Sequence, residues 1–152
     1  MKRVPILAVL APFVGIVLLG LGGAPFQRAN RPGGVILVRP GDIQWTDYPG
    51  RPGVGLAMIE GDLTKSGPFL MRVKFPAHFR LAPHSHPGIE HSLVISGALR
   101  IGYGTRDDGP METLGPGTIL ITPAGTPHFL ATDEETIVQT HGLGPWGSTP
   151  VK

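Results

Sequence analysis

The chain has 152 residues, including 23 glycines and 17 prolines, a composition that predicts frequent turns and disfavours long helices. Its net charge is +2, from 13 basic and 11 acidic residues, and no more than two basic residues are adjacent, so a nucleic-acid partner is not expected. There is no cysteine, which excludes disulfides, thiolate metal ligands, a cysteine nucleophile and a lipoprotein anchor.

The N-terminal end differs in composition from the rest of the chain. Lys2 and Arg3 precede an apolar run over residues 4–21, a pattern typical of a secretory signal or an uncleaved membrane anchor. Small residues at 22–24 offer a cleavage site, but Pro25 follows it and disfavours cleavage, so both alternatives stay open. Either one predicts an exported protein. It would be periplasmic or extracellular after cleavage, or tethered through residues 4–21 to the outer face of the inner membrane.

We expect residues 1–24 to form this signal or anchor, 25–34 a polar linker, and 35–148 one folded domain. The domain contains about eight short apolar and β-branched runs between turn residues, without helical periodicity. In chain order these expected strands are residues 35–38, 42–45, 54–60, 69–75, 92–102, 117–122, 129–132 and 136–140. Short strands with regular turns predict an all-β sandwich or barrel rather than an α/β fold.

Four potential metal ligands lie in two separate stretches of this domain. The first stretch carries His84, His86 and Glu90, and the second carries His128 after a turn at residues 123–127. Residues two apart on a strand point to the same face, so His84 and His86 can converge on one ion. Three imidazoles and one carboxylate suit one divalent transition metal, with Fe, Mn, Ni, Cu, Co and Zn all acceptable. These residues alone do not guarantee that the fold brings the two stretches together.

The spacing of these residues resembles the two sequence motifs of the cupin superfamily. The first motif is His84-x-His86, three residues, Glu90, six residues and Gly97, and the second is Gly117, five residues, Pro123-x-Gly125, two residues and His128. The resemblance implies a small antiparallel double-stranded β-helix barrel of the jelly-roll type. It also implies that one metal ion is bound by His84, His86, Glu90 and His128. The chain departs from the motifs at His78, where glycine is usual, and at Thr132, where asparagine is usual; both are structural positions in the family.

Three further residues are candidates for a pocket beside the metal. Arg72 alternates with apolar residues, and it would bind a carboxylate or orient a reacting oxygen if it faces inward; a solvated strand position is the alternative. Gln139 shares a strand face with Ile137, and His141 follows the last expected strand, where it could close the barrel mouth. By contrast, we expect His91 at the surface or at a subunit interface because it follows Glu90 on the strand.

These features lead to two functional hypotheses of different classes. The first is a metal-dependent enzyme acting on a small molecule. Oxygenase-like, possible dioxygenase chemistry on an enol or phenol is favoured over lyase, decarboxylase or isomerase reactions, because the resemblance offers precedent for this ligand set. The second is a non-catalytic periplasmic module that binds or senses a ligand or a metal, favoured by the lack of a separate acid–base group in the motifs. The resemblance also implies a homodimer, in which residues 35–38 could pair across subunits.

Overall fold

The computed structural model describes residues 34–151 of the chain. Within them, the regular structure consists of short strands and one 3-10 turn, Pro40–Asp42. The strands are β1 (Thr46–Asp47), β2 (Gly55–Glu60), β3 (Gly67–Phe75), β4 (Phe79–Ser85), β5 (Glu90–Ser96), β6 (Leu99–Tyr103), β7 (Glu112–Leu114), β8 (Ile119–Thr122), β9 (His128–Thr132), β10 (Thr136–Gly144) and β11 (Thr149–Pro150). The expected signal or anchor at residues 4–21 lies outside the described residues. Among those that are described, no helix has the length and apolar character needed to cross a membrane.

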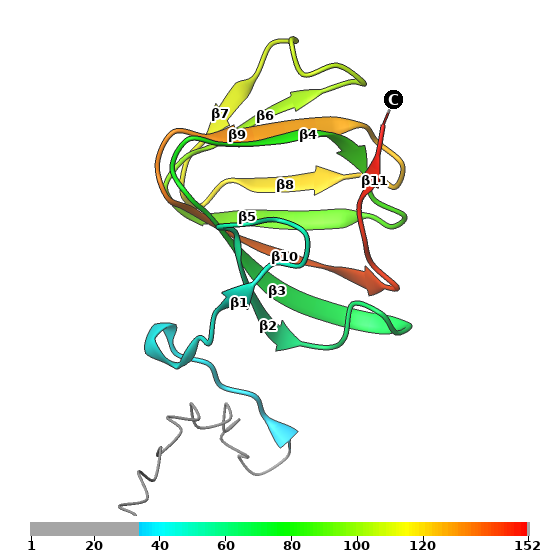
Figure 1. Ribbon diagram of the computed structural model, residues 1–152. Coiled ribbons are helices and arrows are strands. Elements are labelled where there is room, and N and C mark those ends of the chain that lie inside the picture. The colour runs from blue at the N-terminus through cyan, green and yellow to red at the C-terminus, as the bar shows by residue number, and fades with distance from the viewer. Residues whose placement is uncertain (1–33, 152) are drawn as a thin grey trace, which may run out of the picture.

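The strands form two antiparallel sheets that face each other (Figure 1). The six-stranded sheet has the order β1-β2-β3-β10-β5-β8, and the five-stranded sheet has the order β11-β4-β9-β6-β7. The all-β, antiparallel character agrees with the sequence prediction. The closed barrel does not: among the described strands, no ladder joins one sheet to the other. Three of the four edge strands, β1, β7 and β11, are only two or three residues long and offer little backbone for such pairing.

The core lies between the two sheets because alternate residues of the longer strands are apolar. On β3, Phe69, Met71, Val73 and Phe75 are buried, and the residues between them belong to the opposite face of the sheet. Their cluster is completed by apolar side chains of the five-stranded sheet, among them those of Leu99, Ile101 and Leu130. The space between the sheets is therefore largely apolar.

The expected strand over residues 92–102 is divided at Gly97, and its two halves lie in different sheets as β5 and β6. Gly97 has a φ of 73°, a conformation that favours glycine. A Cβ at this position would lie 2.4 Å from the carbonyl oxygen of Glu135, which leaves no room for a side chain. This glycine therefore lets the chain pass from the first sheet to the second.

Strand β4 is absent from the series of expected strands, although the expected convergence of His84 and His86 requires strand geometry there; His84 lies on β4 and His86 directly follows it. It contains Pro83, which lacks a backbone donor, and its pairing with β9 is interrupted by a register shift between Leu81 and His84. A proline and an irregular register hide a strand from a pattern of alternating residues.

In the N-terminal part of the domain, two expected strands do not form. Residues 35–38 form no strand, and 42–45 form part of a turn and a connection rather than a strand. Instead, residues 36–38 border a second depression, on the outer face of the six-stranded sheet, beside Ile59 and Leu70. At the other end, β11 begins at residue 149, just beyond the expected domain limit of 148, and pairs with β4.

Candidate metal centre

The fold brings the two motif stretches together at one end of the space between the sheets. His84 on β4 is the register partner of His128 on β9, and His86 follows β4 directly. One nitrogen of each of the three imidazoles lies within 4.8 Å of the other two. Glu90 begins β5 in the facing sheet. Hydrogen bonding between β4 and β9 thus juxtaposes residues that are distant in the sequence, as the predicted site requires.

Each of the three imidazoles has its Nδ1 atom bonded to a backbone carbonyl. His84 Nδ1 donates to the oxygen of Ala82 at 2.9 Å, and His86 Nδ1 donates to that of Gly147 at 2.8 Å. His128 Nδ1 donates to the oxygen of Thr126 at 3.1 Å. Because a carbonyl can only accept, these bonds place the ring proton on Nδ1 and leave the Nε2 lone pair free. Such partners are typical of histidines that bind metal through Nε2.

The carboxylate of Glu90 faces two of these imidazoles. Its Oε2 atom lies 3.6 Å from Nε2 of His86 and 3.7 Å from Nε2 of His128. Its Oε1 atom accepts a hydrogen bond of 3.1 Å from Ser92, whose hydroxyl lies 3.0 Å from that of Thr140. One oxygen is thus held by Ser92 of the same strand, while the other faces His86 and His128.

Burial affects the charge of two of the imidazoles, His84 and His86. It lowers the pKa of His84 to about 4, and it also lowers the pKa of His86, on which the nearby Glu90 carboxylate acts in the opposite direction. Both rings are therefore uncharged near neutral pH. The uncharged ring is the form that can donate its lone pair to a metal.

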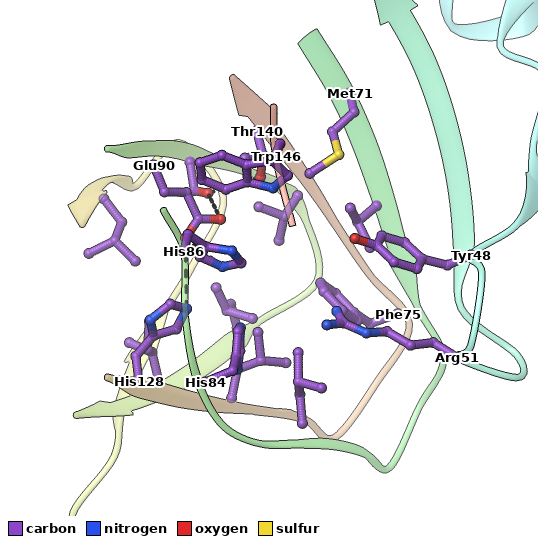
Figure 2. A pocket seen from close by; sticks show the side chains of 18 residues that line it. Tyr48, Arg51, Met71, Phe75, His84, His86, Glu90, His128, Thr140 and Trp146 are labelled. Carbon is purple, nitrogen blue, oxygen red and sulfur yellow. Dashed lines mark hydrogen bonds and ion pairs between the residues drawn. The ribbon is translucent and has the colours of Figure 1, made fainter. Parts of the chain in front are cut away.

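These residues line a cavity of about 50 Å³ that opens to solvent (Figure 2). Much of the wall is apolar, with Leu81, Leu99 and Ile101 among its residues. The ring of Trp146 stacks on His86, with centroids 4.5 Å apart and planes 14° apart. Two polar side chains, Tyr48 and Arg51, enter from the loop between β1 and β2.

The structure places the three expected pocket residues elsewhere. Arg72 donates to Gln139 at 3.1 Å, and both border the outer depression beside residues 36–38 rather than the cavity. His141 is exposed on the outer face and stacks on His91 with ring centroids 4.6 Å apart. The cause is the two-residue alternation of strands, which turns the neighbours of buried core residues outward. His91, expected at the surface or at a subunit interface, is half-buried and lies outside the cavity.

Three residues of the cavity wall were not singled out from the sequence. Tyr48 and Arg51 belong to a Pro- and Gly-rich loop, and Trp146 follows the last long strand. None of the three lies on a long strand, so the alternation of residues carries no information about them. Only the residue types could have indicated a binding role, since aromatic and arginine side chains in loops are frequent in binding sites.

Comparison with known proteins agrees with this geometry. The sequence model of the cupin domain matches residues 71–140, a range that includes every one of the candidate ligands. No curated protein matches the chain. The fold is shared with KdgF from a Halomonas species, at 20% identity and a TM-score of 0.55 over 69% of this chain and 91% of that one.

Two further structures have the same fold. The polyketide cyclase RemF from Streptomyces resistomycificus is 18% identical, with a TM-score of 0.64 over 78% of this chain and 86% of that one. Salicylate 1,2-dioxygenase from Pseudoaminobacter salicylatoxidans, solved with gentisate, is 15% identical, with a TM-score of 0.54 over 66% of this chain and 29% of that one. The cupin domain matched over residues 71–140 and the shared fold together support membership of this chain in the cupin superfamily.

Proposed function

We propose that this chain is a metal-dependent enzyme that acts on a small molecule, with oxygenase-like chemistry ahead of lyase, decarboxylase or isomerase chemistry. The observation that carries the proposal is the convergence of three oriented imidazoles and one carboxylate in an otherwise largely apolar cavity. The fold shared with a dioxygenase and a polyketide cyclase supports enzymatic use of such a cavity.

The donor atoms fit one divalent transition metal. Bonds from imidazole nitrogen or carboxylate oxygen to such an ion are about 2.1 Å long, so two donors of one ion lie at most about 4.2 Å apart. The separations of 3.6 and 3.7 Å between Glu90 and two imidazoles satisfy this limit. The imidazole nitrogens lie within 4.8 Å of one another, which is close to this limit. We therefore propose His84, His86, Glu90 and His128 as the ligands.

A bound ion would supply Lewis-acid polarisation of a substrate oxygen, or reactivity toward dioxygen if the metal is redox-active. The residues of the chain contribute the remaining functions. Ser92 orients the carboxylate of Glu90, and Trp146 supports the ring of His86. The apolar wall excludes water from a substrate in the cavity.

The proposal is tested by turnover of the purified full chain loaded with each candidate metal. We expect oxygen consumption or product formation with at least one small phenol or enol. Activity should be lost in the His84→Ala, His86→Ala double variant and kept in the matched outer variant His91→Ala, His141→Ala. If no metal gives turnover with any such compound while a metal is bound, the chain is not the proposed enzyme.

The second candidate is a non-catalytic periplasmic module that binds a ligand or a metal. It is favoured by the composition of the cavity wall. Among the described residues that line it, Tyr48 and Arg51 are the ionisable groups besides the candidate ligands. No separate carboxylate or imidazole is thus in place to transfer a proton. Tight metal binding without turnover would support this function.

Export and self-association complete the proposal. The apolar run at residues 4–21 supports export or membrane attachment, which separation of membrane and periplasmic fractions would test.

The exposed side chains of Ile119, Ile121 and Leu143 support a homodimer, since exposed apolar side chains that cluster are a frequent feature of interfaces. Light scattering of the purified protein would measure its mass in solution.

A further inference from the structure

The loop between β1 and β2 presents an arginine to the metal cavity in a fixed conformation. Tyr48 and Val54 are joined by a backbone hydrogen bond of 2.8 Å, and Arg51 forms backbone bonds to both of them at 3.0 and 3.1 Å. Val54 is fully buried, which anchors the end of the loop in the core. Gly50 and Gly53 have φ values of 74° and 79°, as the tight turns of this loop require. The loop is thus held in one conformation by its own backbone hydrogen bonds and its buried end.

The side chain of Arg51 is held on two sides. Its guanidinium carbon lies 4.7 Å from the centre of the Tyr48 ring, and its Nη2 atom donates to the hydroxyl of Ser148 at 2.6 Å. The guanidinium points into the space that the imidazoles also face (Figure 2). Its positive charge is a minor cause, after burial, of the lowered pKa of His84 and of His86. Arg51 therefore shares an electrostatic environment with the candidate metal centre.

This guanidinium has no acidic partner in the part of the chain that the structure describes. No carboxylate among residues 34–151 lies within 4.0 Å of it, whereas Arg39, Arg100 and Arg106 each pair with an aspartate. A guanidinium has five N–H donors in a planar fork, and the bond to Ser148 uses one of them. A half-buried arginine with free donors beside a cavity has the geometry that binds a carboxylate through two parallel hydrogen bonds.

We propose that Arg51 binds the carboxylate of the substrate, so that the cavity takes a small monocarboxylic acid whose uncharged end reaches the imidazoles. This inference rests on the proposed function and names its substrate class. A carboxylate is favoured over a phosphate because Arg51 is the one cationic side chain among the described residues that line the cavity, and Glu90 adds a negative charge to it. A dianion would need more positive charge than this wall offers.

The test compares acids with their uncharged amides. Acetate, benzoate and phenylacetate, each beside its amide, are titrated calorimetrically into the full-length metal-loaded protein, with inorganic phosphate as a further probe. We expect at least one acid to bind more tightly than its amide by about 10- to 100-fold, the range of a charge-assisted pair. Arg51→Gln should abolish this preference and Arg51→Lys should restore part of it. Arg100→Gln, at an arginine paired with Asp133, is the matched control and should keep it.

Two further measurements separate a binding role from a structural one. Ser148→Ala removes the hydrogen-bond partner of Arg51 but keeps the guanidinium, and it should retain the preference for acids. Metal content is measured for every variant and should not change in Arg51→Gln. The proposal is overturned if no acid binds better than its amide, if Arg51→Gln keeps the preference, or if phosphate binds more tightly than every acid. Acid preference that depends on Arg51 in a protein that takes up no metal would support the carboxylate site while contradicting the proposed enzyme.

Discussion

Histidines lie on two faces of this molecule, and the two groups differ in how their second nitrogen is held. In the inner group, His84, His86 and His128 each donate from Nδ1 to a backbone carbonyl. In the outer pair, His91 and His141 stack across neighbouring strands, and the buried Nδ1 of His91 has no hydrogen-bond partner. Proximity of imidazoles is thus common to both groups. What distinguishes the inner group is the set of backbone carbonyls that hold each Nδ1 and leave each Nε2 free.

The largest expected effect comes from removing the carboxylate that joins the inner group. Glu90→Gln replaces a charged oxygen that lies 3.6 Å from Nε2 of His86 with a neutral amide. We expect the metal dissociation constant to rise by more than about 100-fold, beyond the range seen when an outer partner of a ligand is lost. Competition with a coloured chelator measures it. Glu135→Gln, in an exposed turn, is the control, and an equal rise there would contradict the assignment.

Acid should destabilise the metal-free protein through the buried imidazole of His84. Burial lowers the pKa of His84 from 6.5 to about 4, so between these values the unfolded chain binds more protons than the folded one. Stability from this group is therefore full above pH 6.5 and falls as pH decreases toward 4, by up to about 3 kcal/mol. Urea unfolding at several pH values would show the slope. The slope should be smaller in His84→Gln, and an unchanged slope would contradict this account.

A smaller effect is expected from the groups that orient the carboxylate. Ser92→Ala removes the hydroxyl that donates to Oε1 of Glu90, and we expect metal affinity to fall by about 10-fold. Ser96→Ala lies on the same strand, beside Ile137, and is the matched control. Equal affinities in the two variants, measured by chelator competition, would show that the hydroxyl of Ser92 does not support the ligand.

The smallest effect on the metal is expected from the outer face. Ile121→Lys changes an exposed residue that pairs with His91, and metal content should stay the same. If the homodimer forms through this face, the same variant should be monomeric by light scattering, because a buried lysine without a partner is costly. Loss of metal in this variant would show that the two faces are not independent.

The candidate ligands and the family could be predicted because they depend on local spacing. His84 and His86 are two residues apart, and the remaining motif positions follow at fixed intervals. The expected all-β class followed from apolar runs such as residues 69–75, which form part of β3. Whether a metal binds stays a prediction.

Other features could not be predicted because they depend on long-range geometry. Alternation assigns Arg72 and Met71 to opposite faces, but it does not say which face is the inner one. Arg51 reaches the cavity through loop turns and a bond to Ser148 that no strand pattern encodes. The division of the expected strand at Gly97 required knowing that Glu135 packs against it.

The most direct test of the difference between the two histidine groups is the metal content of three purified full-length proteins. Elemental mass spectrometry would compare the unchanged chain with the inner variant His84→Ala, His86→Ala and the outer variant His91→Ala, His141→Ala. We predict about one equivalent of a divalent transition metal in the unchanged chain and the outer variant, and none in the inner variant. Equal metal content in all three proteins, or none in the unchanged chain after loading with each candidate metal, would contradict the central claim.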